Sequence, residues 1–190
     1  MIRDYQRQRV YTAERSTSMY CSNAAGANLP TANWDVLQQY VLGITETRWF
    51  QSRWPRQTIR VKDGRRKRCA TGGYGTISMP KWSRSPLVIL HEIAHAVSDW
   101  NNDKHGPIFC GHFLYLVYHR LGVCAYQELR KRFLLNGVDF NDPIQAAIPV
   151  LTTEQIIEKM KAMPKRKANP AAIDALRRYR ETKKMAHVIA

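Results

Sequence analysis

The chain contains the stretch Ser85-Pro86-Leu87-Val88-Ile89-Leu90-His91-Glu92-Ile93-Ala94-His95-Ala96-Val97, in which two histidines lie four residues apart. The serine can cap a helix, the proline fits the first helical position, and the apolar residues that follow would form a broad buried surface. Residues four apart share one face of a helix, so His91 and His95 can reach the same metal ion. Glu92 can then exchange protons with water at that ion.

A catalytic zinc site needs a third protein ligand, and the sequence favours His105. This histidine precedes Gly106-Pro107, where a loop can turn back and the proline can open a second helix. Ser98 and Asn101 occupy the glycine and third-histidine positions of the H-E-x-x-H-x-x-G-x-x-H pattern, which excludes that subclass. The alternative third ligands are Asp99, Asp103, His112, His119 and Glu128.

This donor set predicts a zinc hydrolase that attacks a peptide or amide carbonyl. Glu92 would act as catalytic base and then acid during attack of zinc-bound water on the substrate carbonyl. A second group is expected to stabilise the oxyanion, and four tyrosines are candidates. These are Tyr74, Tyr115, Tyr118 and Tyr126, and the sequence does not favour one of them.

Two segments, His91 to Ala96 and Asn101 to Cys110, resemble the core of the SprT-like, or Spartan-type, zinc metallopeptidases. The resemblance implies that His91, His95 and His105 bind zinc and that Glu92 is the catalytic acid/base. It also implies substrates among proteins associated with DNA. The loop between the last two histidines is shorter than in Spartan-type members, and no Cys-x-x-Cys pair follows to build their zinc ribbon.

The N-terminal residues resemble a second family, the metallohydrolases of actinobacteria and their phages. The resemblance lies in Arg3-Asp4-Tyr5-Gln6-Arg7 and Val10-Tyr11-Thr12-Ala13-Glu14. It extends the similarity to most of the first two thirds of the chain.

A small mixed sheet is predicted upstream of the histidines. Thr58 to Lys62 alternates apolar and polar residues, Asp63-Gly64 is a hairpin signal, and residues 65–70 would return as a second strand. Thr76 to Met79 would form another strand, whose exposed edge could bind an extended substrate peptide.

Helices are predicted on both sides of this sheet in the sequence. One spans Trp34 to Phe50 with Asn33 as its N-cap, and one spans Ala125 to Leu135 with Asn136-Gly137 as its stop signal. Together with the strands they predict an α+β fold with a zincin-like core, a metal-binding helix and a mostly helical C-terminal part.

The 190 residues are expected to divide into a zincin-like metallopeptidase domain at 1–140 and a basic helical extension at 141–190. Within the extension, Thr152 and Gln155 form a capping box for a helix through Lys161. Asn169-Pro170 would start another helix.

Cysteine usage and hydropathy favour the cytoplasm, which would be the host cytoplasm for a phage-encoded protein. No secretory signal core or membrane-spanning stretch is expected, so no membrane partner is predicted. The four cysteines lack paired metal-ligand spacing and are expected to be reduced. They are Cys21, Cys69, Cys110 and Cys124.

A net charge of +15 and a pI near 10.0 favour an anionic partner, of which nucleic acid is the first choice. A highly soluble, solvated surface is the alternative reading. The basic residues gather at 65–68, 130–132, 165–167, 177–180 and 183–184.

Two other functions remain open beside a metallopeptidase with a protein or peptide substrate. One is a nucleic-acid-binding protein with a structural zinc site, and the other is a zinc amidase acting on a non-protein substrate. Glu92 argues against the first, because a structural site closes its fourth position with protein and needs no neighbouring carboxylate.

Overall fold

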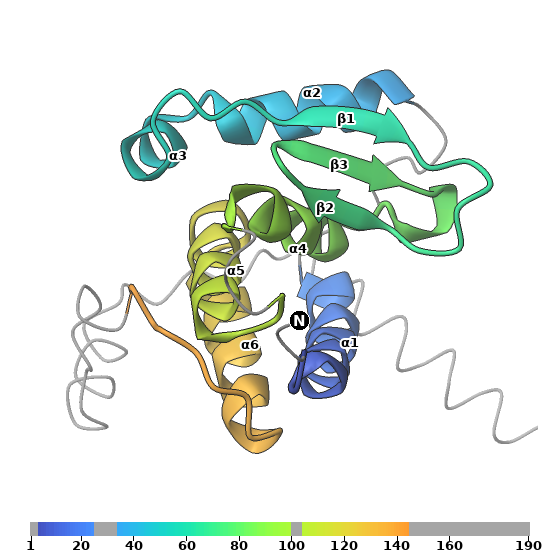
Figure 1. Cartoon of the computed structure of the whole chain (residues 1–190). Helices are drawn as coiled ribbons and strands as arrows, with labels where there is room; N and C mark the ends of the chain where they lie inside the picture. Colours follow the sequence, from blue (N-terminus) through green and yellow to red (C-terminus); the bar gives the residue numbers. More distant parts are fainter. Residues whose placement is uncertain (1–3, 25–33, 100–103, 145–190) are drawn as a thin grey trace, which may run out of the picture. The chain divides into compact units, whose positions relative to one another are not determined.

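The computed structural model describes residues 4–24, 34–99 and 104–144 (Figure 1). They belong to the first of two compact units into which the chain divides, Met1–Ile148 and Pro149–Ala190. The helices expected in the C-terminal extension, including the capping box at Thr152, lie outside the described residues, and the domain boundary at 140 stays a prediction. None of the described helices is long and apolar enough to cross a membrane.

The described residues confirm the α+β class with a small mixed sheet. The helices are α1 (Arg7–Ala24), α2 (Trp34–Thr45), α3 (Arg48–Arg53), α4 (Pro86–Val97), α5 (Pro107–Leu121) and α6 (Val123–Leu135). The strands are β1 (Arg60–Asp63), β2 (Thr71–Gly73) and β3 (Thr76–Met79), and a short 3-10 helix spans Lys81–Ser83.

The strand order is β1-β3-β2, with β1 parallel and β2 antiparallel to β3. The hairpin predicted at Asp63-Gly64 is therefore wrong, and residues 65–70 are not a strand. A two-residue turn there would have placed Lys62 opposite Arg65 and Arg60 opposite Lys67, and like charges in directly opposed positions destabilise a sheet.

The hairpin of this sheet instead joins β2 to β3 through Tyr74 and Gly75. Both turn residues have positive φ, at 47° and 64°, which matches the twist of a tight hairpin. The strand predicted at Thr76 to Met79 is confirmed, but it is the central strand. Its edge cannot receive a peptide, and the free edge on that side of the sheet belongs to β2.

The sheet packs against α4 through a glycine. A Cβ on Gly72 would lie 2.0 Å from the carbonyl oxygen of Glu92, so only glycine allows β2 to approach α4 this closely. The amide of Gly75 also donates to the carbonyl of Ala96, at 3.1 Å. Together these contacts fix the edge strand beside the helix that carries the two histidines (Figure 1).

The start of α4 is as predicted. Ser85 accepts a hydrogen bond from the amide of Val88, and Pro86 occupies the first turn. The helix predicted to start at Pro107 is confirmed as α5. The helix predicted to stop at Asn136-Gly137 is confirmed as α6. Gly137 has φ of 62°, the left-handed conformation expected at a helix end.

The single helix predicted from Trp34 to Phe50 is wrong, since the structure has α2 and α3 in its place. Thr47 has extended backbone angles and its hydroxyl accepts from the amide of Phe50, which caps a new helix. The first helix therefore ends at Thr45, although the apolar pattern continues beyond it. Asn33, its expected cap, lies outside the described residues.

Helix α1 was not predicted, and it packs against α6 beside α4 and α5 (Figure 1). Its inward side includes Val10, Ala13, Glu14 and Thr17, which recur at helical spacing. Because two of these four residues are polar, the apolar period is weak. The position of the helix is set by its tertiary packing and by its polar contacts.

Candidate metal centre

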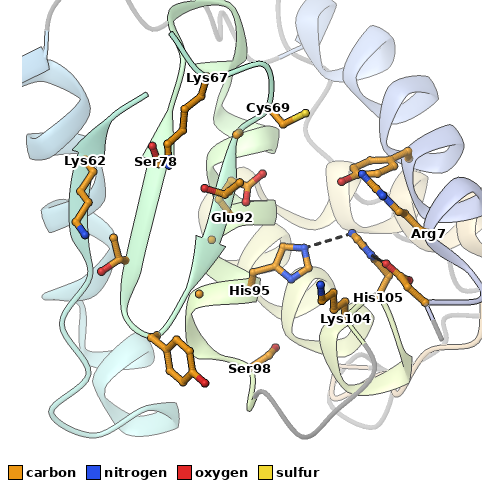
Figure 2. A pocket seen from close by; sticks show the side chains of 18 of the residues that line it. Arg7, Lys62, Lys67, Cys69, Ser78, Glu92, His95, Ser98, Lys104 and His105 are labelled. Atoms are coloured by element: carbon orange, nitrogen blue, oxygen red, sulfur yellow. Dashed lines mark hydrogen bonds and ion pairs between the residues drawn. The ribbon is translucent and has the colours of Figure 1, made fainter. Parts of the chain in front are cut away.

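The structure brings His91, His95 and His105 together, as predicted. The first two come from one face of α4, and the third comes from the turn before α5. Figure 2 shows His95 and His105 facing each other. One ring nitrogen from each residue lies within 4.8 Å of the other two. Such a group can hold a metal ion, and within the described residues it has three members.

The nitrogen spacing fits a tetrahedral ion. Two nitrogens that each lie 2.0–2.1 Å from Zn²⁺ are about 3.3 Å apart at a tetrahedral angle. The Nε2 atoms of His95 and His105 are 3.3 Å apart. Nε2 of His91 is buried and has no hydrogen-bond partner among the described residues, a costly state that an ion would relieve.

Two carboxylates from the N-terminal part of the chain lie behind the histidines. Oε2 of Glu14 is 2.9 Å from Nδ1 of His91, and Oδ2 of Asp4 is 2.7 Å from Nδ1 of His105. A carboxylate at Nδ1 selects the tautomer that leaves Nε2 as the metal donor, and it orients the ring. The same atoms therefore face the centre of the cluster in both histidines.

Sequence reasoning missed both carboxylates. Glu14 had a signal, because it occupies a buried position of the helical period that Val10 and Ala13 begin. A carboxylate on a buried face requires a partner. Asp4 precedes the first helical residue, and nothing in its neighbourhood pointed to the site.

Aromatic rings enclose the imidazoles. Tyr11 stacks on His91 with ring centroids 5.4 Å apart and meets His105 edge-on at 5.2 Å. Phe109 of α5 stacks on His95 at 4.2 Å. Because these rings block the alternative rotamers, the three imidazoles are held in place by packing as well as by the carboxylates.

Gln6 fixes the N-terminal segment to the site. Its amide nitrogen donates to the carbonyl of His105 at 2.6 Å and to that of Asp139 at 2.9 Å, and its amide oxygen accepts from the amide of Asp139 at 2.9 Å. The side chain is buried. This bridge holds Asp4 in reach of the ring of His105.

Glu92 is buried and lines the same cavity as His95. The pKa of Glu92 is raised to about 7, chiefly by burial; His91 opposes the shift and the nearby Glu14 adds to it. A cation among the imidazoles would lower this pKa again, because it favours the ionised carboxylate. Near neutral pH this carboxyl group can therefore both accept and return a proton.

The surroundings of His95 and His105 favour their neutral form, in which a ring nitrogen can bind a metal. Burial and the neighbouring His91 lower the pKa of His95, and they lower that of His105 to about 4 despite Asp4. Burial alone would lower the pKa of His91, but the carboxylates of Glu14 and Glu92 outweigh it and raise this pKa. Metal binding requires neutral imidazole, so a proton on His91 competes with the metal.

His95 and His105 line a cavity of about 940 Å³ (Figure 2). It is lined by the N-terminal segment, α4, the loop before α5 and the strands of the sheet. The free edge of β2 contributes Thr71, Gly72 and Gly73 to this lining. A ligand in the cavity can therefore contact the imidazoles and the main chain of an edge strand together.

The other candidate ligands do not join the cluster. His112 contacts the hydroxyl of Ser98 at 3.1 Å, His119 stacks on Trp49, and Glu128 pairs with Arg132. The remaining two are Asp99, which lines the cavity outside the histidine group, and Asp103, which lies outside the described residues.

Of the four candidate tyrosines, Tyr74 lines the cavity. The hydroxyl of Tyr115 donates to the carbonyl of Trp49, and that of Tyr126 donates to Asp142. The ring of Tyr118 packs against Tyr126. Tyr11, which the sequence did not single out as an oxyanion donor, lies closer to the histidines and also lines the cavity.

Comparison with protein-family models, with curated proteins and with solved structures found no match for this chain. The function is therefore inferred from the residues of the site.

Proposed function

We propose that this protein is a zinc-dependent metallopeptidase of the SprT-like type with a zincin-like core. The observation that carries the proposal is the convergence of three imidazoles beside a buried carboxylate in an open cavity. His91, His95 and His105 would hold the ion, with Glu14 and Asp4 orienting two of the rings. A bound Zn²⁺ supplies Lewis acidity, which strengthens water as a nucleophile and a peptide carbonyl as an electrophile.

Glu92 carries the proton transfers in this proposal. One carboxylate oxygen takes a proton from the attacking water and returns it to the leaving nitrogen when the peptide bond breaks. Its burial suits both steps, since desolvation raises its pKa and opposes the lowering that the bound cation causes. The carboxylate lies on α4 next to His91, so the helix fixes its position relative to the metal ligands.

The free edge of β2 provides the substrate contact. An extended peptide can add to this edge by main-chain hydrogen bonds, which require no particular side chains. The edge belongs to Thr71–Gly73, whose small residues leave room for a peptide backbone. This assignment moves the substrate edge from β3, where the sequence suggested it, to β2.

The open cavity favours catalysis over a structural metal site. A structural zinc is closed by a fourth protein ligand, whereas the described residues supply three ligands and a cavity next to them. A zinc amidase for a non-protein substrate would share the metal chemistry. The edge strand beside the metal site favours a peptide, because it matches the repeat of a polypeptide backbone.

Contact with nucleic acid forms a separate part of the proposal. Arg65, Arg66, Lys67 and Arg68 are exposed on the connection between β1 and β2, and the whole chain carries a charge of +15. Such a surface attracts phosphates, and the attraction falls with salt. Proteins associated with DNA are accordingly the substrates we propose for the cytoplasmic enzyme.

The test combines metal analysis with proteolysis. We expect the purified wild-type protein to contain one Zn²⁺ per chain and to cleave an unfolded protein, and we expect Glu92→Gln to retain the metal and lose cleavage. Assays with and without single-stranded DNA test the nucleic-acid part. Equal cleavage by wild type and Glu92→Gln would contradict the role of Glu92.

Glu46→Gln serves as the matched control. Glu46 is an exposed carboxylate between α2 and α3, outside the cavity lining. Its substitution should leave metal content and cleavage unchanged. Loss of cleavage in this variant would show that the assay reports a general effect of removing a charge.

A further inference from the structure

The cavity continues from the histidines across the open face of the sheet, where three side chains form a row. Lys62 of β1 and Thr71 of β2 both lie opposite Ser78 of the central strand β3. Residues opposite one another on neighbouring strands point to the same face. All three line the cavity, together with Lys67 (Figure 2).

This end of the cavity is positively charged. Among the described residues, neither Lys62 nor Lys67 forms an ion pair. Asp63, the nearest acidic residue in the sequence, alternates to the other face and pairs with Arg65 and Arg84. The carboxylates that line the cavity come from the metal end, and they are Asp4, Glu92 and Asp99.

Ser78 supplies an independent sign of a ligand. The residue is 3% exposed, and its hydroxyl has no hydrogen-bond partner among the described residues. An unsatisfied buried hydroxyl is unfavourable, and such groups in native structures call for an explanation. A ligand oxygen that reached the floor of the cavity between the two lysines would satisfy it.

We propose that Lys62, Lys67 and Ser78 form a subsite for an acidic side chain of the peptide substrate. The inference rests on the proposed peptidase function and names a specificity for it. A carboxylate can accept hydrogen bonds from two ammonium groups and a hydroxyl together, and charge-assisted bonds of this kind are strong.

The small residues of β2 make the subsite accessible from its edge. Neighbouring strands lie about 4.8 Å apart, so Ser78 is about two strand spacings from a peptide paired with the free edge of β2. Thr71 and Gly73 are the residues of β2 on the open face, and Gly73 has no side chain, which leaves room beside Thr71. A glutamate side chain that extends from the peptide and a flexible lysine side chain that extends toward it can together cover that distance.

The separation of charges favours a peptide over a nucleic acid in this cavity. A nucleic acid carries a negative charge at every nucleotide and would meet the carboxylates at the metal end. A peptide can place one acidic side chain at Lys62 and Lys67 and a neutral amide at the histidines. The arginines of the basic connection that lie outside the cavity lining, Arg65, Arg66 and Arg68, remain available to nucleic acid.

Binding measurements on uncleaved peptides test the subsite. All proteins carry Glu92→Gln and are loaded with Zn²⁺, and the fluorescent probes are extended peptides of one length that bear glutamate, glutamine or lysine at successive positions. We expect the best glutamate peptide to bind about tenfold more tightly than its glutamine counterpart, as fits one charge-assisted site. Added salt should reduce this preference.

The lysine variants locate the effect. Replacing Lys62 and Lys67 together with glutamine should abolish the preference for glutamate and leave the glutamine peptide bound as before. Ser78→Ala should reduce the preference several-fold in a protein with unchanged circular dichroism. Lys131→Gln, which changes an exposed lysine of α6 outside the cavity lining, should keep the full preference.

Three results would overturn the subsite. The first is equal affinity for the glutamate and glutamine peptides. The second is a preference for glutamate that survives in the double lysine variant. The third is that the double lysine variant binds single-stranded DNA more weakly although the protein does not distinguish the peptides. Failure of the peptidase itself would appear separately, as absence of bound Zn²⁺ or of cleavage by the wild-type protein, because the binding assay requires no turnover.

Discussion

Glu14 and His91 meet at 2.9 Å between Oε2 and Nδ1, which joins a helix near the start of the chain to the helix that carries His91 and His95. Both side chains are buried. The contact fixes the ring so that its unpartnered Nε2 faces the other two imidazoles. Helix α1 therefore belongs to the candidate metal centre although it contributes no ligand.

Glu14→Gln should weaken zinc binding. The amide keeps the size of the side chain but removes the charge that supports His91, and loss of such a partner lowers metal affinity by about 10–100-fold. The affinity is measured by competition with a chromogenic chelator near pH 7.5. Asp4→Asn should act in the same direction through His105, because its carboxylate lies 2.7 Å from Nδ1 of that ring.

The exposed Glu46 again provides the comparison, since Glu46→Gln should bind zinc as wild type does. If Glu14→Gln and Glu46→Gln bind zinc equally, the carboxylate behind His91 has no part in the metal site.

Zinc should stabilise the fold through the three histidines. A ligand that binds the folded chain at 100 times its dissociation constant adds about 2.7 kcal/mol to the free energy of unfolding. We expect the thermal midpoint to rise on addition of Zn²⁺ and to fall again with a chelator. His95→Ala should remove this response, whereas His119→Ala, at a histidine stacked on Trp49 outside the cluster, should retain it.

Gly72→Ala should destabilise the protein. The added Cβ would lie 2.0 Å from the carbonyl oxygen of Glu92, so β2 and α4 must move apart. Overpacking of this kind costs about 1–3 kcal/mol, measured as the free energy of unfolding in urea. The shift would also displace Glu92, so cleavage should fall together with stability.

Gly43→Ala is the control for the same chemical change. Gly43 lies in α2, and a Cβ there would meet nothing within 4 Å. Alanine favours the helix over glycine by about 1 kcal/mol, so this variant should be slightly more stable than wild type. Similar destabilisation by both substitutions would show that the contact between Gly72 and α4 does not limit the fold.

The three histidines of the candidate metal centre could be predicted from the sequence because their local spacing indicates a metal site. His91 and His95 share a capped helix, and the proline after His105 marks the start of the next one. The carboxylates that contact these histidines could not be predicted in the same way. Glu14 and Asp4 reach the site through tertiary packing of α1 and the residues before it, and a helical period that buries Glu14 does not identify the histidine that it contacts.

The sheet shows the same limit of local patterns. The strand at Thr76 to Met79 was predicted correctly from its residues, but its partners were not. A turn signal at Asp63-Gly64 suggested an adjacent hairpin, whereas β1 pairs in parallel with a strand that comes after β2. This pairing decides which strand has a free edge, and therefore which strand could bind a substrate peptide.

His112 should make the fold sensitive to mild acid. Burial lowers the pKa of His112 to about 4, with a further contribution from Arg53, whereas an unfolded histidine titrates near pH 6.5. The unfolded chain therefore binds the proton first as the pH falls. The stability present above about pH 6.5 is lost between there and pH 4, and this one group accounts for up to about 2 kcal/mol between pH 7.5 and pH 5.

His112→Gln isolates this contribution, because glutamine can still bond the hydroxyl of Ser98 but does not titrate. Urea unfolding at pH 7.5 and pH 5, with chelator present throughout, gives the loss of stability for each protein. The loss should be smaller in the variant than in wild type by up to about 2 kcal/mol, since all other groups contribute equally to both. An identical loss in the two proteins would mean that His112 takes up its proton in the folded state as readily as in the unfolded one.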